Sequence, residues 1–252
     1  MILIDGDVLV YRAAWAAQKR DTPLDPADRA LYSLWKMIDT IKSRLSQEEI
    51  KVFLTSSDKS NYRYSVAKRK PYKSNRPPKP HYYNLLRTYL TRRYNTEVVY
   101  GREADDALVT HLYSNTNYIC ASIDKDLRQG PGLHYDIVEG TKQLVSDPGE
   151  LIVSSNRLKL KGGGYKWFYA QMLLGDVVDS IPGVNGYGPV KTEALLSKIV
   201  SEEECVCAVF KVYEEVFKEQ AKEYFFEAAD LLWIQRKEGE IKSEYLKALM
   251  GG

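Results

Sequence analysis

The stretch Arg102-Glu103-Ala104-Asp105-Asp106-Ala107 places three carboxylates within four residues, at the point where an apolar strand gives way to a helix. Two carboxylates about 4 Å apart repel each other by about 4 kcal/mol at an effective dielectric constant of about 20. Such a cluster is stable only where metal ions or bound protons neutralise it. The stretch therefore predicts a strand-to-helix junction that carries a cation site.

Further carboxylates come directly after other predicted strands. They are Asp5 and Asp7 after residues 1–4, Asp58 after residues 51–56, and Asp124 and Asp126 after residues 118–123. Strands that alternate with helices predict a parallel sheet, and ligands of such sheets bind outside the carboxyl ends of the strands. We therefore expect one acidic edge. Each aspartate can instead be a helix N-cap, and for Asp7 that interpretation is at least as strong as a catalytic one.

The remaining pattern predicts an α/β core followed by helices. Predicted elements are helices at 25–46, 81–93 and 104–114, a strand at 97–100, a hairpin from 133 to 145, helices at 165–174 and 190–200, two helices within 203–235, and a polar tail. Residues 161–164 predict a flexible joint, since three of them are glycine. We expect a core at 1–160 and a helical region at 161–252. Residues 175–189 form a glycine-rich connection that can hold a phosphate on free backbone N–H groups, although tight turns also need glycine.

Residues 59–93 form a strongly basic segment. They carry eleven Lys or Arg and no Asp or Glu, although the net charge of the chain is only +2, and six tyrosines are interleaved with these cations. Cations among aromatics are typical of surfaces that neutralise phosphates and stack bases. The alternative is a solvated face whose tyrosines point into the core. Four prolines between 71 and 80 exclude one continuous helix, so we expect a loop or arch at about 59–80.

The composition indicates an ordinary globular protein of a reducing compartment. The chain of 252 residues is 44% apolar, which is enough for one sizeable core. No apolar run reaches the roughly 18 residues of a membrane span, and no signal segment is recognisable, so a cytoplasmic location is expected. The three cysteines make no disulfide framework.

The predicted site is rich in carboxylates and poor in histidine, which selects Mg²⁺ or Mn²⁺ over zinc. An acidic edge and a basic segment together suit a phosphodiester substrate. Two metal ions about 4 Å apart can stabilise both the attacking and the leaving oxygen. Eleven cations exceed what one phosphate needs, so nucleic acid is favoured over a small phosphate ester.

Five blocks of the sequence resemble the 5' nucleases, which comprise bacteriophage flap endonucleases and 5'-3' exonucleases and the N-terminal nuclease domain of bacterial DNA polymerase I. The blocks follow the family's order from residue 4 to about residue 200. They are Ile4-Asp5-Gly6-Asp7; Asp58 with Tyr62-Arg63 and Tyr72-Lys73-Ser74-Asn75-Arg76-Pro77-Pro78; Glu103-Ala104-Asp105-Asp106; Asp124-Lys125-Asp126; and Gly175-Asp176 through Asp179, Ile181-Pro182-Gly183-Val184 and Gly186-Tyr187-Gly188.

The resemblance implies a PIN-like, Rossmann-like nuclease core with a C-terminal helix-three-turn-helix region. It implies that one metal ion is held by Asp5, Asp58, Glu103 and Asp105, and a second by Asp105, Asp124, Asp126 and Asp176, with Asp106 and Asp179 acting through water. It also implies that Lys73 and Arg76 contact the scissile phosphate, that Tyr72 stacks on a terminal base, and that Arg63 supports the same region. Gly183, Gly186, Gly188 and Lys191 would grip the duplex backbone, in some members with a bound K⁺.

Two positions depart from the family pattern. Val190 stands where the family places a lysine directly after Gly188-Pro189, so Lys191 is shifted by about 100° around a helix. Ser180 stands where asparagine is common.

The sequence therefore predicts a monomeric, stand-alone 5' nuclease of phage type that acts on DNA 5' ends, flaps and junctions in a bacterial or phage-infected cytoplasm. Asp124 and Asp176 are the metal ligands that we expect to be most directly catalytic. Two alternatives remain open: a PIN-type ribonuclease, and a structure-specific DNA-binding protein without catalysis.

Overall fold

The structure is a computed structural model that describes residues 1–18 and 25–251. The contacts within the chain divide it into two compact units. The sheet unit consists of Met1–Asn61, Pro77–Asp124 and Gly132–Leu144, and the helical unit consists of Tyr62–Arg76, Lys125–Pro131 and Val145–Gly252. Each unit is thus assembled from segments that are distant in sequence.

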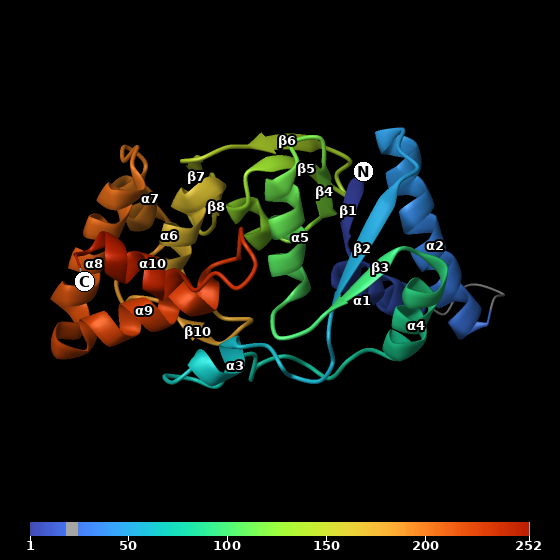
Figure 1. The fold of residues 1–252 in the computed structure, drawn as a ribbon, viewed down its shortest axis with the longest axis horizontal. Coiled ribbons are helices and arrows are strands. Elements are labelled where there is room, and N and C mark those ends of the chain that lie inside the picture. The colour runs from blue at the N-terminus through green and yellow to red at the C-terminus, as the bar shows by residue number, and fades with distance from the viewer. Residues whose placement is uncertain (19–24, 252) are drawn as a thin grey trace. The chain divides into compact units, whose positions relative to one another are not determined.

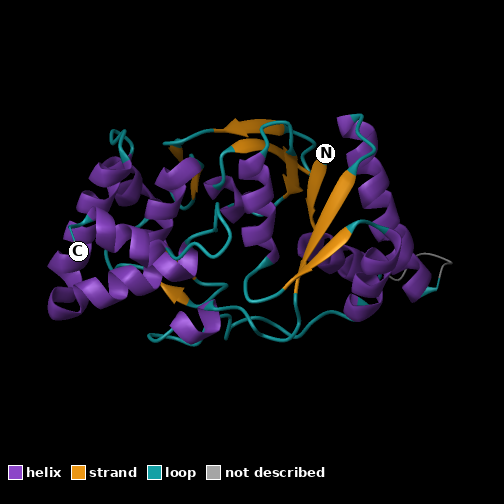
Figure 2. Ribbon diagram, viewed as in Figure 1, coloured by secondary structure: helices purple, strands orange, loops and turns teal. Residues whose placement is uncertain are grey.

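The sheet unit contains a six-stranded sheet in the order β3-β2-β1-β4-β5-β6. The strands are β1 (Ile2–Asp5), β2 (Ile50–Thr55), β3 (Thr96–Val99), β4 (Ile119–Ser122), β5 (Gly132–Asp136) and β6 (Lys142–Val145). The five strands from β3 to β5 all pair in parallel. The predicted α/β class with a mostly parallel sheet is confirmed (Figures 1 and 2).

Helices cover both faces of this sheet (Figure 1). On one face, α1 (Gly6–Ala16), α2 (Pro26–Leu45) and α4 (Tyr83–Arg93) pack on Ile2 and Ile4 of β1. On the other face lies α5 (Ala104–Ser114), whose His111 ring is 5.0 Å from the ring of Phe53 in β2. Because side chains of a strand alternate between faces, covering both faces requires consecutive apolar residues, such as Ile2, Leu3 and Ile4 of β1.

Helix α2 begins and ends where its sequence signals predict. Asp25 caps it by accepting a hydrogen bond from the N–H of Ala27 at 2.8 Å, and Pro26 occupies the first helical position. At the other end Ser46 adopts a left-handed φ of 51°, which stops the helix. Between them, the buried residues repeat at spacings of three and four, as in Leu34, Ile38 and Ile41.

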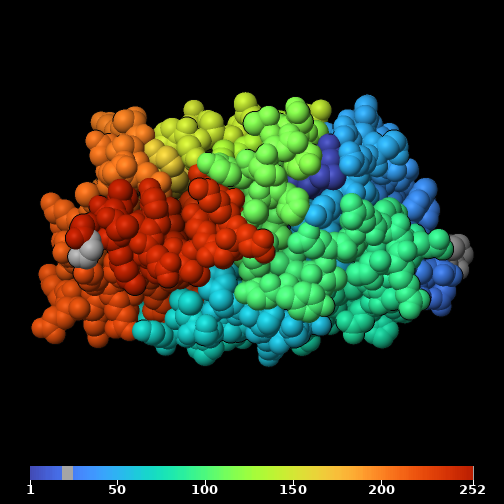
Figure 3. Space-filling view, viewed as in Figure 1, coloured from blue at the N-terminus to red at the C-terminus, as the bar shows by residue number. Residues whose placement is uncertain are grey.

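The helical unit is organised around α6 (Gly164–Leu174), which is buried along nearly its whole length. Its other elements are α3 (Arg63–Val66), η1 (Asp126–Gln129), β7 (Leu151–Val153), β8 (Leu160–Gly162), β9 (Gly175–Asp176), β10 (Ile181–Pro182), α7 (Pro189–Leu196), α8 (Glu202–Phe217), η2 (Lys218–Gln220), α9 (Ala221–Leu232) and α10 (Lys242–Leu249). Tyr213 of α8 donates a hydrogen bond to the carbonyl of Met172 at 2.7 Å, and Phe168 packs edge-on against Trp233. The C-terminal end of the chain, which includes α10 and is drawn in red, forms a continuous part of the unit's surface (Figure 3).

The structure corrects the expectation of a polar tail, because residues 242–249 form α10. Lys242 anchors that helix: it is 3% exposed, its ammonium is 2.7 Å from Glu202, and it lies 3.7 Å from the ring centroid of Trp233. A buried ion pair inside an aromatic cage explains how a polar segment becomes ordered. The sequence showed only its polarity.

The structure also revises the expected joint at residues 161–164. Gly162 ends β8, and a side chain on Gly163 or Gly164 would meet Val145 or the backbone of Pro148. These glycines therefore allow close packing. The expected boundary between a core at 1–160 and a helical region at 161–252 stays a prediction. The two compact units are each assembled from several segments, whose ends lie at other positions. No helix within residues 1–18 and 25–251 is long and apolar enough to cross a membrane.

The contact between α1 and β2 leads to a testable prediction about Gly6. A Cβ atom at this position would lie 2.6 Å from the carbonyl oxygen of Phe53 and 2.7 Å from Val52. We expect Gly6→Ala to lower the free energy of unfolding by about 2 to 4 kcal/mol in urea titrations, because backbone must move. Gly188→Ala, with nothing within 4 Å of its Cβ, is the matched control and should cost less than about 1 kcal/mol. Equal losses would contradict the packing argument.

Candidate active site

The carboxyl ends of four adjacent parallel strands carry the carboxylates of the sheet unit. In spatial order the strands are β3, β2, β1 and β4. The acidic residues that end or follow them are Glu103, Asp105 and Asp106 after β3, Asp58 after β2, Asp5 at the end of β1, and Asp124 after β4. Because the strands run parallel, these positions share one edge of the sheet.

Asp5 lies at the centre of this edge and is only 2% exposed. One carboxylate oxygen accepts a hydrogen bond from the N–H of Val8 at 3.0 Å and caps α1, and the other accepts one from the Ser122 hydroxyl at 2.7 Å. Burial, followed by the negative charges of Asp7 and Asp124, raises the pKa of Asp5 to about 7, against the opposing effect of these hydrogen bonds. This site therefore favours either a bound proton or a cation.

Ser122 links Asp5 to Asp124, because its hydroxyl also accepts a hydrogen bond from the Asp124 N–H at 2.9 Å. Asp58 is different: it is exposed, and its carboxylate accepts a hydrogen bond from the N–H of Ser60 at 2.9 Å. That backbone hydrogen bond is the largest cause of a lowered Asp58 pKa. The two carboxylates thus have opposite electrostatic surroundings.

Glu103 and Asp106 form a reciprocal cap at the start of α5. The Glu103 side chain accepts a hydrogen bond from the Asp106 N–H, and Asp106 accepts one from the Glu103 N–H at 3.0 Å. Asp106 is fully buried, whereas Asp105 in the same turn is only partly buried. Two of the three carboxylates in the opening stretch therefore also have a structural role.

Asp7 does not cap α1, since Asp5 takes that position. Asp7 accepts hydrogen bonds from the N–H of Thr55 at 3.0 Å and from the Arg87 guanidinium at 2.9 Å. Arg87 also donates to the carbonyl of Thr55 at 2.7 Å. This three-residue network ties α1 and α4 to the end of β2. Sequence reasoning placed Arg87 only among the eleven basic residues, because nothing local identifies its partner.

The helical unit holds the other predicted ligands. Asp126 accepts a hydrogen bond from the Gln171 side chain at 2.7 Å, and Asp176 accepts bonds from the N–H groups of Val178 and Asp179. The Lys125 ammonium lies 3.1 Å from Asp126 and 3.7 Å from Asp176. A side-chain cation thus already sits between two carboxylates that were predicted to share an ion.

Asp179 gathers three residues of the basic segment. One of its oxygens accepts hydrogen bonds from Arg76 at 2.7 and 3.1 Å, and the other accepts one from the Tyr72 hydroxyl at 3.2 Å and lies 3.8 Å from the Lys73 ammonium. The Asp179 carbonyl also accepts a hydrogen bond from the Lys73 N–H. One carboxylate therefore positions two cations.

The backbone of this contact adopts unusual conformations. Lys73 and Ser180 have positive φ values of 57° and 64°. Asparagine tolerates the left-handed region better than serine does, which is a physical reason for the asparagine that the family resemblance leads us to expect at position 180. The Ser180 hydroxyl accepts hydrogen bonds from Ser74 and Asn75, which compensates locally.

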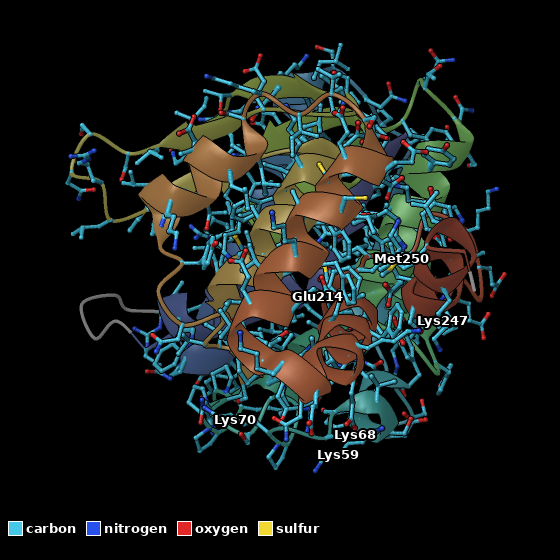
Figure 4. All side chains as sticks on the ribbon, turned by 90° about the vertical axis from the view of Figure 1, so that its left-hand side faces the viewer. Lys59, Lys68, Lys70, Glu214, Lys247 and Met250 are labelled. Carbon is cyan, nitrogen blue, oxygen red and sulfur yellow. The ribbon has the colours of Figure 1, made fainter. Side chains whose placement is uncertain are left out.

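Two predicted DNA contacts are buried. Arg63 is 2% exposed and donates to the carbonyls of Leu231 at 3.0 Å and Trp233 at 2.6 Å. Tyr72 is 5% exposed. Both side chains anchor the basic segment to the helical unit, so direct contact with DNA would require them to leave these partners. Other cations of the segment, including the labelled Lys70, project outward (Figure 4).

The glycine-rich connection has one tightly packed side and one open side. A Cβ on Gly183 would collide with the carbonyl of Leu174. Gly186, with a φ of 83°, and Gly188 have nothing within 4 Å of such an atom. Lys191 is exposed, with its ammonium 3.9 Å from the ring centroid of Tyr187. The open backbone beside an exposed cation suits a phosphate.

Within residues 1–18 and 25–251, no three His, Cys, Asp or Glu side chains are grouped so that they could hold a metal ion. The predicted ligands are divided between the units. Six of them belong to the sheet unit (Asp5, Asp58, Glu103, Asp105, Asp106 and Asp124), whereas Asp126, Asp176 and Asp179 belong to the helical unit. The ligand assignment therefore stays a prediction.

Sequence comparisons find bacterial enzymes of DNA metabolism. The chain is 30% identical over 211 residues to a 5'-3' exonuclease of Buchnera aphidicola subsp. Baizongia pistaciae and 25% identical over 212 residues to that of the subspecies Schizaphis graminum. These matches cover 78% and 79% of this chain, but 65% and 69% of the relatives. The chain is also 26% identical over 219 residues to DNA polymerase I of Caldicellulosiruptor bescii, and this match covers 81% of the chain and 25% of the polymerase. No family model matches.

Similar folds occur among solved structures. The D15 protein of bacteriophage T5, crystallised with metal ions, aligns over 98% of this chain and 91% of its own, with a TM-score of 0.66 at 15% identity. The catalytic core of Rad2 in complex with DNA substrate aligns over 99% of this chain and 71% of its own, with a TM-score of 0.51 at 13% identity. These likenesses confirm the expected fold.

The environment of Asp5 predicts a pH-dependent stability. Its folded-state pKa of about 7 lies above the ordinary 3.8, so the stability that the protonated carboxyl contributes is complete below pH 3.8 and is lost as the pH rises to about 7. This shift corresponds to about 4 kcal/mol. In EDTA, Asp5→Asn should match the wild type near pH 4 and exceed its free energy of unfolding by up to about 4 kcal/mol at pH 8.

Urea titrations across this pH range test the prediction. Asp58→Asn is the control, because the pKa of Asp58 is lowered and its neutralisation should give no gain at pH 8. A wild-type protein as stable as Asp5→Asn at every pH would show that neither burial nor the neighbouring carboxylates penalise the charged form of Asp5.

Proposed function

Since the chain is related to the 5' nuclease family in sequence and shares its fold, we propose that it is a divalent-metal-dependent 5' nuclease. It would hydrolyse DNA phosphodiesters near 5' ends, flaps and junctions, as a 5'-3' exonuclease and flap endonuclease in DNA replication, repair or recombination. We further propose that it acts as a monomer in a bacterial or phage-infected cytoplasm. The two similar 5'-3' exonucleases are from Buchnera, a bacterium, and the T5 protein comes from a bacteriophage.

The observation that carries this proposal is the order of the strands. Four neighbouring parallel strands deliver carboxylates to one edge, and the central one, Asp5, is buried with a pKa of about 7. If these acidic residues served only as helix caps, they would not need to share one edge of the sheet. Asp5 would also not need to be buried beside other carboxylates. An edge of this kind has the chemistry of a hard-cation site.

The carboxylates of this chain fit Mg²⁺ or Mn²⁺, because oxygen is their only donor atom. We assign one ion to Asp5, Asp58, Glu103 and Asp105, and a second to Asp105, Asp124, Asp126 and Asp176, with Asp106 and Asp179 acting through water. When bound, such ions activate water and stabilise charge on phosphate oxygens. A K⁺ ion at residues 183–188 would suit the open backbone of the glycine-rich connection.

The residues around Asp179 would act on the substrate phosphate. Lys73 and Arg76 supply two positive charges, and Asp179 holds both of them in place. A phosphate that carries developing negative charge would therefore be stabilised by preorganised cations. Gly183, Gly186, Gly188 and Lys191 would bind the duplex away from the reacting bond.

The function can be tested by mapping products on DNA. We expect the purified chain with Mg²⁺ to release short products from 5'-labelled flap and nicked duplexes, and EDTA to abolish the reaction. An RNA substrate cleaved in preference to DNA would favour a ribonuclease, and DNA binding without any cleavage would favour a purely binding role. Either result would overturn the proposal.

Asp176→Asn and Asp124→Asn provide the internal controls of that assay. Each should lower cleavage by at least about 100-fold while leaving duplex binding within a few-fold of the wild type, since only the charge of the carboxylate is removed. Turnover at the wild-type rate in both variants would refute the proposed metal ligands.

A charge-neutral variant tests the role of Lys73. Lys73→Gln keeps a polar, hydrogen-bonding side chain but removes the charge, and should reduce the single-turnover cleavage rate by about 100-fold, because a preorganised cation is lost from the phosphate. Lys70→Gln is the matched control: it lies three residues away in the same basic segment, is exposed, and should cleave at nearly the wild-type rate. Equal rates in the two variants would exclude this role.

A further inference from the structure

The hairpin of β7 and β8 has an outward face that the rest of the helical unit does not bury. Its strands pair antiparallel, with Ile152 opposite Lys161 and Val153 opposite Leu160. Leu151 and Leu160 are buried, whereas Ile152 is 60% exposed and Lys161 is exposed. One face thus holds the hairpin on the unit, and the other presents an aliphatic and a basic side chain.

The tip of the hairpin is held rigidly by its own hydrogen bonds. The N–H of Arg157 donates to the carbonyl of Ser154 at 2.8 Å, and the N–H of Lys159 donates to the Ser154 hydroxyl at 3.0 Å. The Asn156 side chain accepts hydrogen bonds from the Ser154 hydroxyl at 2.7 Å and from the N–H of Leu158 at 3.2 Å. These hydrogen bonds therefore fix the backbone conformation of the tip and with it the positions from which the exposed side chains project.

The base of the hairpin is equally constrained. The N–H of Gly163 donates to the carbonyl of Glu150 at 3.1 Å. A Cβ on Gly149 would collide with the backbone of Gly163, so the two segments approach as closely as glycine allows. The hairpin is thus fixed at both ends, and α6 begins directly after it at Gly164.

The exposed residues of the hairpin combine positive charge with an unexplained apolar side chain. Arg157, Lys159 and Lys161 are all exposed, and Glu150 is the only carboxylate between residues 150 and 164. Leu158 is 74% exposed between two of these cations. The tip therefore combines three exposed cations with an apolar side chain, which favours a ligand that has both a polyanionic backbone and an apolar surface.

We propose that the β7–β8 hairpin is an additional binding element for duplex DNA, in which Arg157, Lys159 and Lys161 contact phosphates and Leu158 lies against the sugar edges of the minor groove. This inference rests on the proposed function, since it takes DNA as the substrate. Helix α7 packs against both strands of the hairpin, and α7 follows the glycine-rich connection assigned to the duplex (Figure 1). The two elements would thus extend one binding surface.

The chemistry of the hairpin favours duplex over single-stranded DNA. Proteins that bind single strands stack the bases on aromatic side chains, and residues 150–164 contain no aromatic residue. Aliphatic side chains flanked by arginine and lysine are instead typical of elements that enter the minor groove. A protein partner would be expected to cover Leu158 and Ile152 without requiring the three cations.

Binding of a labelled blunt duplex by the full chain in EDTA tests the proposal across a series of NaCl concentrations. The triple variant Arg157→Gln, Lys159→Gln and Lys161→Gln should raise the dissociation constant about tenfold and reduce the slope of its logarithm against log salt by about 2 to 3. Leu158→Ser should raise the dissociation constant about threefold and leave the slope unchanged.

The matched control replaces three cations on another part of the helical unit. Lys211, Lys218 and Lys222 are exposed on α8, η2 and α9, and Lys218, like Arg157, has a positive φ. Lys211→Gln, Lys218→Gln and Lys222→Gln together should leave both the affinity and the slope near the wild type. Equal losses from the two triple variants would mean that only net charge matters and would overturn the proposal.

The outcomes separate this inference from the proposed catalysis. If the wild type cleaves DNA with Mg²⁺ and the hairpin variants bind duplex as tightly as the wild type, the hairpin proposal falls and the nuclease remains. If no protein cleaves but the hairpin variants still lose duplex affinity, the nuclease falls and the hairpin remains. Unchanged melting temperatures of Leu158→Ser and the triple variant would exclude misfolding as the cause of any loss.

Discussion

The burial of Asp5, together with the negative charges of Asp7 and Asp124 beside it, is the constraint on which the sheet unit depends. Parallel strands cannot avoid bringing their carboxyl ends to one edge, and this chain ends or follows four neighbouring strands with acids. Hydrogen bonds from Val8 and Ser122 relieve only part of the cost, because the pKa of Asp5 is still raised to about 7. The charged form of Asp5 therefore costs free energy in the folded chain, and a bound cation would lower that cost. The stability of the fold and its capacity to bind a cation thus depend on the same carboxylates.

Much of the sheet unit could be predicted because its signals are local. Apolar runs that end in aspartate predicted the strands. The acidic stretch at 103–106 predicted the start of α5, which the structure places at Ala104. Helix α1 was not predicted, although Leu9, Val10 and Ala13 are buried at helical spacings. Helix α10 could not be predicted, since it depends on burial of Lys242 against residues far away in the sequence.

The candidate site shows the same division between local and distant information. Its acidic positions are readable from the sequence, but their partners are not. The pairing of Asp7 with Arg87 and the burial of Arg63 under the carbonyls of Leu231 and Trp233 join residues 80 or more positions apart. A basic residue in a basic segment can bind phosphate or anchor a loop, and only tertiary contacts distinguish these uses.

Lys73 occupies a backbone conformation, with a φ of 57°, that glycine would adopt at little cost. A non-glycine residue in this region carries a conformational penalty of about 1 kcal/mol. A chain that evolved for thermal robustness alone would drift toward glycine there. Lys73→Gly would relieve the conformational penalty and could be chosen to raise thermal stability. It would also remove a cation that Asp179 holds in place, so stability and chemistry favour different residues at this position.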